Sequence, residues 1–344
     1  MEEQNNVSAF ICVLIAAVIL LMVNLTQADS KEQTHTDLKF YSTDKRALKN
    51  GAYSVQHGVQ SHVQCVRNCH MDAKCISVNY IETNLICELN NASRAEHTDE
   101  LLKDCESMYF DAEESTRRLP ALQQCSCLDL LKDGQTESRE YYISPPSISK
   151  GLKVYCDMET DNGGWIVFQR RIDGKVAFNR NWLDYQDGFG QASGEFWLGN
   201  ENLRKLTESS GKWQLRVELL DWDGSTGWSG YNQFSVSNDN YRLTCNEYDE
   251  RSTAGDSMRL HNGMLFSTKD QDNDVNDNAH CAVVRPGGWW YYRCVQANPN
   301  GQYFDYEDRN IPTTSGSGWG IIWKTWTGQY YSLKACTMKI RELA

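Results

Sequence analysis

The sequence predicts an α+β protein made of two unlike domains, a small cysteine-rich one followed by a larger tryptophan-rich one. The chain has 344 residues, which corresponds to about two domains at ~150 residues each. All 11 Trp lie between Trp165 and Trp326, so the two halves do not read as repeats of one fold. The 13 Cys of this polar chain indicate an oxidising compartment, in which disulfides stabilise secreted domains.

The composition excludes several classes of function. The formal charge is −12 at pH 7 and there is no basic run, so the chain should repel the phosphates of nucleic acids. Hydrophobic residues make up 40% of the chain, which is enough for a folded core. The sequence has no G-x-S-x-G, H-E-x-x-H or phosphate-loop motif, so we expect a binding protein and no enzyme.

Residues 1–28 are predicted to be a signal peptide. Ala9–Val23 is an unbroken apolar run, long for a signal-peptide core but shorter than the ~20 residues that span a bilayer. Thr26 and Ala28 suit a cleavage site, which would leave a secreted chain that begins at Asp29 and has no membrane span. Because two Glu and no basic residue precede the apolar run, an uncleaved membrane anchor stays the alternative.

The first domain is expected at residues 38–111. Ser61–Gln64 has the pattern of a capping box, which predicts a helix to about His70. Residues 76–80 and 85–89 alternate in polarity as strands do. We therefore expect a helix packed on a small antiparallel sheet.

The cysteine spacing C-x3-C-x5-C-x11-C, with the strand ISVNY before the last Cys, resembles the PAN/apple module. The resemblance implies the disulfides Cys65–Cys87 and Cys69–Cys75, and a module that binds proteins or sugars. Asn91 begins a glycosylation sequon, which suits a secreted glycoprotein. The charged segment 112–124 is expected to link this module to the second domain.

The second domain is expected at residues 125–344. Ser126 can cap a short helix that Gly134 ends, and Asn200 can cap a second helix. Three runs alternate or are apolar as strands are, at 152–156, 165–170 and 213–220. From Gly263 onward the chain shows little periodicity, which predicts a loop-built subdomain held by a metal, a disulfide and stacked rings.

Six segments together resemble the fibrinogen C-terminal domain, a family that includes fibrinogen chains, ficolins, tachylectins, tenascins and angiopoietins. The resemblance implies an antiparallel sheet with flanking helices, a C-terminal calcium and ligand subdomain, and the disulfides Cys127–Cys156 and Cys281–Cys294. The segments are CDMETDNGGWIVFQRR (156–171), EFWLGNENL (195–203), TAGDSM (253–258), HNGMLFSTKDQDND (261–274), GGWWYYRC (287–294) and YYSLKACTMKIRE (330–342).

Acidic residues alternate at 270, 272 and 274, and such a loop offers the carboxylate and carbonyl oxygens that Ca²⁺ requires. An EF-hand is excluded, since neither Gly at position six nor Glu at position twelve is present. The resemblance implies that Asp272 and Asp274 bind Ca²⁺ through carboxylates, and that Asn276 and Asn278 bind it through backbone carbonyls.

The resemblance also implies a ligand pocket beside Cys281–Cys294. Members that bind acetyl groups have a His after the second Cys and an aromatic residue four positions after the first. This chain has Val295 and Arg285 there, and a guanidinium favours carboxylate or sulfate over a neutral acetyl group. We expect further aromatic residues to line the pocket, at Tyr303, Trp319, Trp323 and Tyr330.

Four extracellular cysteines have no implied partner. Cys245 and Cys336 both lie in strand-like runs of the second domain, and we expect them to pair. Cys105 and Cys125 lie on either side of the linker, and two alternatives stay open. They can pair with each other, or each can bridge to another chain and give a disulfide-linked oligomer.

These observations predict a secreted, calcium-binding recognition protein. The leading hypothesis is lectin-like binding of surface glycans, in a role such as innate defence. The alternative is an extracellular matrix protein or receptor ligand that binds other proteins through the same face of the fibrinogen-like domain.

Overall fold

The computed structural model describes residues 40–96, 101–112, 124–208, 212–311 and 317–343, apart from a few side chains in two strands. The predicted leader, residues 1–28, and most of the predicted linker lie outside these residues. Among the described helices, none combines the length and the apolar character needed to cross a membrane.

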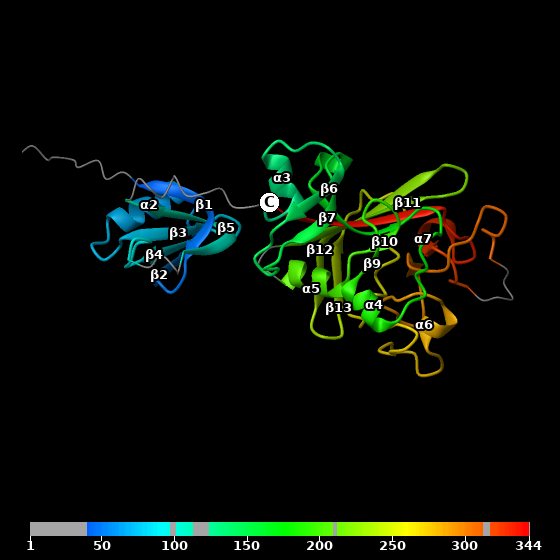
Figure 1. The fold of residues 1–344 in the computed structure, drawn as a ribbon. Helices are drawn as coiled ribbons and strands as arrows, with labels where there is room; N and C mark the ends of the chain where they lie inside the picture. Colours follow the sequence, from blue (N-terminus) through cyan, green and yellow to red (C-terminus); the bar gives the residue numbers. More distant parts are fainter. Residues whose placement is uncertain (1–39, 97–100, 113–123, 209–211, 312–316, 344) are drawn as a thin grey trace, which may run out of the picture.

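The first domain is a five-stranded antiparallel sheet with one helix packed on it (Figure 1). The strand order is β1-β5-β3-β4-β2, and helix α2 (His62–His70) packs against β3 and β4. Cys65 and Cys69 form the buried side of α2; Cys65 is bonded to Cys87 and Cys69 to Cys75. The strands are β1 (Tyr41–Leu48), β2 (Ala52–His57), β3 (Ser77–Ile81), β4 (Ile86–Asn90) and β5 (Leu101–Asp111).

Helix α2 begins as the sequence predicts, with one difference in its cap. The Ser61 hydroxyl accepts a hydrogen bond from the Gln64 backbone N–H at 3.2 Å. The Gln64 side chain, however, accepts from the backbone N–H of Gln60 at 3.2 Å, where a full capping box would use Ser61. The sequon residue Asn91 is exposed, directly after β4.

The second domain is built on a nine-stranded antiparallel sheet. The strand order is β13-β12-β11-β16-β8-β10-β9, and β7 also pairs with β8 while β6 pairs with β7. The C-terminal strand β16, red in Figure 1, therefore lies inside the sheet between β11 and β8. The strands are β6 (Arg139–Ile143), β7 (Leu152–Asp157), β8 (Trp165–Arg171), β9 (Phe189–Gly190), β10 (Phe196–Trp197), β11 (Trp213–Leu220), β12 (Thr226–Ser237), β13 (Arg242–Tyr248) and β16 (Ala335–Glu342).

The alternating burial of residues along β11 shows that one face of this sheet packs against the core. The residues of this strand alternate between buried and half-buried along the whole predicted run, as a strand with one face in the core requires. Helix α5 (Asn200–Glu208) packs against β12 and buries Leu203 and Leu206. The other helices of this region are α3 (Cys127–Lys132), which Ser126 caps at its N-terminus, the short 3-10 helix η3 (Thr160–Asn162) and α4 (Trp182–Asp187).

A buried cation lies on the opposite face of the sheet, on the side of the half-buried residues of β11. The Lys339 ammonium on β16 is fully buried and lies 2.6 Å from both the Asp157 carboxylate on β7 and the Glu218 carboxylate on β11. Burial alone would raise the pKa of Asp157, but hydrogen bonds from Lys339 and Thr160 lower it overall. The three charges join strands that are not neighbours in the sequence.

Two cysteines that we expected to pair are free. Cys245 and Cys336 are both buried thiols. Cys245 lies on β13 and Cys336 on β16, and β12 and β11 separate these strands. At ~4.8 Å per strand the two lie roughly 14 Å apart, beyond the ~7 Å limit for a disulfide. The predicted Cys245–Cys336 bridge is therefore wrong.

Two further disulfides lie in this domain. Cys127 is bonded to Cys156, and Cys281 to Cys294, which are the pairs that the resemblance implies. Cys125 is also disulfide-bonded; the side chain of Cys105, the partner in one of the two alternatives, lies outside the described residues.

Between residues 263 and 334 the described chain has little regular structure, as its composition predicts. Its short elements are α6 (Cys281–Val284), β14 (Ala297–Asn298), β15 (Ile322–Trp323) and α7 (Lys324–Thr327). Trp289 and Trp290 are fully buried and their rings meet edge to face at 5.1 Å. Ring contacts of Phe266 and Trp290 with Trp197 on β10 hold this subdomain on the sheet, and the Cys281–Cys294 bridge closes a loop within it.

Candidate functional site: the face beside Cys281–Cys294

The acidic loop is folded around the side chain of Asp274. Its carboxylate accepts hydrogen bonds from the backbone N–H groups of Asn276 and Cys281, both at 2.8 Å. These contacts bend the loop back onto α6. Asp270 has a different role, since it accepts from the backbone N–H of Trp182 at 2.9 Å and ties the loop to α4.

Asp272 and Asp274 face each other. Partial burial raises the pKa of Asp274, although hydrogen bonds from Cys281 and Asn276 oppose this, and the neighbouring Asp272 carboxylate raises it further. A cation between the two carboxylates would relieve their repulsion. The residues present therefore fit a hard cation that takes oxygen ligands, as Ca²⁺ does.

The amide-bearing residues of the loop differ in position. The Asn276 side-chain amide points at the disulfide, 3.6 Å from the sulfur atoms of both Cys281 and Cys294. Its backbone carbonyl accepts from Ala279 at 3.3 Å and keeps a second lone pair. The Asn278 backbone N–H is 3.4 Å from the Asn276 side-chain oxygen. Nowhere in the described residues do three or more His, Cys, Asp or Glu gather as a metal cluster.

The expected anion-binding residue lies beside the same disulfide. Arg285 follows α6 and is half-buried, and burial lowers its pKa. Its Nη1 donates to the Val284 carbonyl at 2.6 Å. A Cβ on Gly318 would overlap the Val295 side chain and lie 3.5 Å from Arg285 Cδ. Arg285, Val295 and Gly318 therefore form one surface, which we call the Arg285 face.

Tyr330 lies near this face, because the residue before it is hydrogen-bonded to Gly318. Its side chain is 40% exposed, so it can meet a ligand. The backbone of the neighbouring residue Gln329 accepts from the Gly318 N–H at 2.8 Å. None of the ion pairs between described residues includes Arg285, so its half-buried guanidinium lacks a protein carboxylate there.

Two further aromatic residues expected in the wall, Trp323 and Tyr303, differ in their surroundings. Trp323 is fully buried, and its indole N–H donates to the Gly255 carbonyl at 3.1 Å. It is a core residue, and its predicted contact with ligand is wrong. Tyr303 packs over Gly174, and its hydroxyl donates to the Ile172 carbonyl. It lines a hollow of 240 Å³ together with Phe178 and with Pro286, the residue that follows Arg285.

A histidine that the sequence reasoning missed supports the segment after the disulfide. His261 is fully buried, and its Nε2 accepts from the backbone N–H groups of Gln296 and Ala297, each at 3.1 Å. Its other nitrogen, Nδ1, donates to the Trp290 carbonyl at 2.7 Å. Burial lowers its pKa to about 4. Neutral His261 therefore fixes the backbone next to Val295.

Comparison with known proteins agrees with this fold. The family model for the C-terminal globular domain of fibrinogen beta and gamma chains matches residues 123–343. The chain belongs to this family. A PAN domain model matches residues 39–127, so a PAN domain precedes the fibrinogen-like domain.

Curated relatives match the fibrinogen-like domain. Fibrinogen C domain-containing protein 1-B of Xenopus laevis is 43% identical over 222 residues, which are 62% of this chain and 46% of that protein. Its human counterpart is 43% identical over 224 residues, 63% of this chain and 46% of that protein. Ryncolin-4 of Cerberus rynchops is 44% identical over 218 residues, which are 63% of this chain and 60% of that protein. The chain spans about half the length of the first two.

Solved structures of fibrinogen-like domains have a similar fold. The fibrinogen-like globe domain of human ANGPTL2 has a TM-score of 0.59 at 38% identity, over 64% of this chain and 99% of that one. Lamprey fibrin D-dimer, solved with the peptide ligand Gly-His-Arg-Pro-amide, has a TM-score of 0.59 at 33% identity, over 67% of this chain and 79% of that one.

Proposed function

We propose that this chain is a secreted recognition protein whose fibrinogen-like domain binds acidic groups on surface glycans through the Arg285 face. The observation that carries the proposal is the Arg285 guanidinium, which has no protein carboxylate within ion-pair distance in the described residues. A forked guanidinium matches carboxylate or sulfate. Ryncolin-4, whose sequence is similar, supports a lectin-like recognition role, and innate defence is the setting that we favour.

Calcium is part of the proposal. Asp272 and Asp274 would hold Ca²⁺ through carboxylates, and the carbonyls of Asn276 and Asn278 would complete the set. The Asn276 side chain contacts both sulfur atoms of Cys281–Cys294. Bound Ca²⁺ would thus order the loop that supports α6 and Arg285.

The calcium proposal is tested by thermal unfolding. We expect wild type to melt at a higher temperature in Ca²⁺ than in EDTA, and Asp274→Ala to lose this difference, since one of two carboxylates is gone. Asp239→Ala, a change of equal charge at an exposed turn, serves as the control. If wild type melts at one temperature in both buffers, the calcium proposal fails.

The ligand proposal is tested on a glycan array with and without EDTA. We expect wild type to bind sialylated or sulfated glycans, and Arg285→Ala to bind them at least ten-fold less. Arg259→Ala removes an equal charge at an exposed position and should leave binding unchanged. Binding should also fall at high salt, which screens exposed charges within ~10 Å at 0.1 M. Strong, salt-insensitive binding to N-acetylglucosamine would contradict the proposal.

A protein ligand is the second candidate. The structural relative from lamprey was solved with a bound peptide, and a protein carboxylate would suit Arg285 as well as a glycan carboxylate does. In that case the array stays blank, while an acidic peptide library binds wild type and fails to bind Arg285→Ala. The role in both cases is binding, without catalysis.

A further inference from the structure

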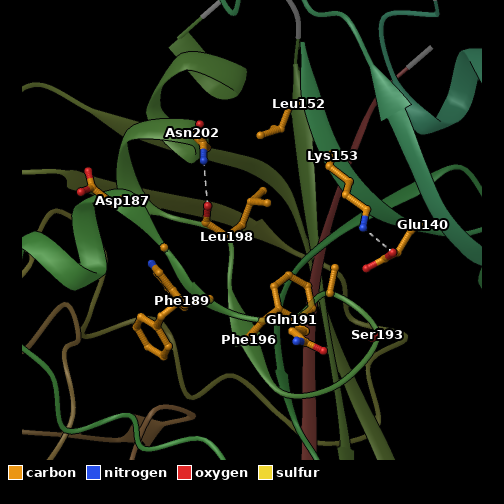
Figure 2. A pocket seen from close by; sticks show the side chains of 14 residues that line it. Glu140, Leu152, Lys153, Asp187, Phe189, Gln191, Ser193, Phe196, Leu198 and Asn202 are labelled. Carbon is orange, nitrogen blue, oxygen red and sulfur yellow. Dashed lines mark hydrogen bonds and ion pairs between the residues drawn. The ribbon is translucent and has the colours of Figure 1, made fainter. Parts of the chain in front are cut away.

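A second hollow lies on the fibrinogen-like domain, lined by residues far from the acidic loop in the sequence. It has a volume of about 580 Å³, inside the ~300–1,000 Å³ range of ligand sites. Figure 2 shows its walls, with the Glu140–Lys153 pair on one side and Asn202 bonded to Leu198 on the other. We call it the β7–β10 groove.

The groove exists because β7 and β10 pair with successive parts of the same edge of β8 and then diverge. Strand β7 pairs with β8 as far as Tyr155↔Val167, and β10 pairs with the next part of the same edge through Trp197↔Gln169. Beyond Tyr155, β7 turns away with β6, so Leu152 and Lys153 no longer lie against β8. A hollow is left where the two strands diverge.

The far wall of the groove, the β9–β10 turn, is held in place. Arg170 donates to the Ala192 carbonyl at 2.8 Å, and its guanidinium stacks over the Tyr155 ring at 4.1 Å. Gly188 and Gly190 have positive φ angles, and a Cβ on either would overlap the facing backbone of β10 or its ends. The groove is therefore preformed, and ligand binding does not require this turn to become ordered.

The lining is polar and carries little net charge. Lys153 is neutralised by Glu140 at 2.6 Å, which leaves Asp187 as the remaining charge. The exposed side chains of Asp187, Gln191 and Ser193 have no hydrogen-bond partner within the described part of the chain. They offer acceptors and donors side by side, and the residual negative charge disfavours anions.

We propose that the β7–β10 groove binds a neutral oligosaccharide. Sugar hydroxyls both donate and accept, which matches carboxylate, amide and hydroxyl groups in one hollow. Leu152, which is half-buried, also lines it and provides apolar surface for the C–H face of a sugar ring. An apolar ligand would leave the free polar groups unpaired. This site is distinct in residues and in charge from the Arg285 face, and it does not depend on the function proposed there.

The test uses the full chain and ligand-observed NMR with three neutral probes that carry no acetyl group, namely maltotetraose, cellotetraose and mannotetraose. Ser193→Trp fills the groove from an exposed turn, so the fold should stay intact, which circular dichroism checks. Ser225→Trp, at the exposed turn between β11 and β12, is the matched control. The variant Arg285→Ala distinguishes binding in the groove from binding at the Arg285 face.

We expect at least one neutral probe to bind wild type, Ser225→Trp and Arg285→Ala with the same affinity within two-fold. Ser193→Trp should bind it at least ten-fold more weakly. The proposal is overturned if no probe binds wild type at millimolar concentration or if Ser193→Trp binds normally. It is also overturned if Arg285→Ala abolishes binding of the neutral probe, because the sugar then occupies the other face.

Discussion

Acidification should destabilise the fibrinogen-like domain through His261. Both ring nitrogens of this buried side chain are used, since Nε2 accepts from two backbone N–H groups and Nδ1 donates to the Trp290 carbonyl. A second proton would have to sit on Nε2, against the N–H groups of Gln296 and Ala297. Burial lowers the pKa to about 4, although the hydrogen bond to the Trp290 carbonyl and the charge of Asp256 partly oppose the shift.

The magnitude follows from proton linkage. The unfolded chain binds a proton at His261 below its ordinary pKa of about 6.5, and the folded chain binds it only below about 4. The stabilising effect of neutral His261 is thus complete above pH 6.5 and is lost as the pH falls toward 4. At about 1.4 kcal/mol per pH unit, the free energy of unfolding should fall by roughly 2 kcal/mol between pH 6.5 and 5.

Urea unfolding followed by Trp fluorescence measures this loss, and it reports on the second domain because all 11 Trp lie there. His261→Gln keeps one donor and one acceptor but cannot titrate. We expect it to be less stable than wild type at pH 7.5 and to lose much less stability between pH 6.5 and 5. If the variant and wild type show the same slope in that window, His261 is not the group responsible and the reasoning is refuted.

Two further predictions concern buried groups of the large sheet. Lys339→Met removes the cation between Asp157 and Glu218 and should lower the free energy of unfolding by roughly 3 kcal/mol, because a partly buried carboxylate is left unpaired; urea unfolding checks this, and a neutral result would contradict it. Cys245 and Cys336 should resist iodoacetamide in the folded protein and react fully in guanidinium, since burial raises the pKa of both thiols, that of Cys336 to about 12. Recovery of a peptide that links Cys245 to Cys336 would disprove their free state.

Local features of this protein could be predicted from the sequence. The α+β class and both family resemblances are confirmed by the family matches and the fold. Strand β11 (Trp213–Leu220) covers the predicted run, because alternation along one strand is a local signal. Ser126 caps α3 through its hydroxyl, which accepts from the Asp129 N–H at 3.2 Å. In these cases the residues that determine the structure are close neighbours in the sequence.

The errors come from contacts between distant segments. Cys245 and Cys336 both lie on strands, but the sequence does not reveal that two other strands separate them. Trp323 looked like a ligand wall, although its surroundings come from segments such as the one around Gly255, 68 residues away. His261 carries no motif of its own, and the β7–β10 groove combines segments 140–153 and 187–202. Only the strand order brings these residues together.

The place of β16 in the sheet has a consequence for biosynthesis. This strand, Ala335–Glu342, pairs with β11 on one edge and β8 on the other. Until it emerges from the ribosome, β8 and β11 have no partner at their facing edges, and exposed edges invite association with other chains. The sheet therefore stays incomplete until β16 is available, and we expect chaperones to shield the open edges of β8 and β11 until that strand pairs with both.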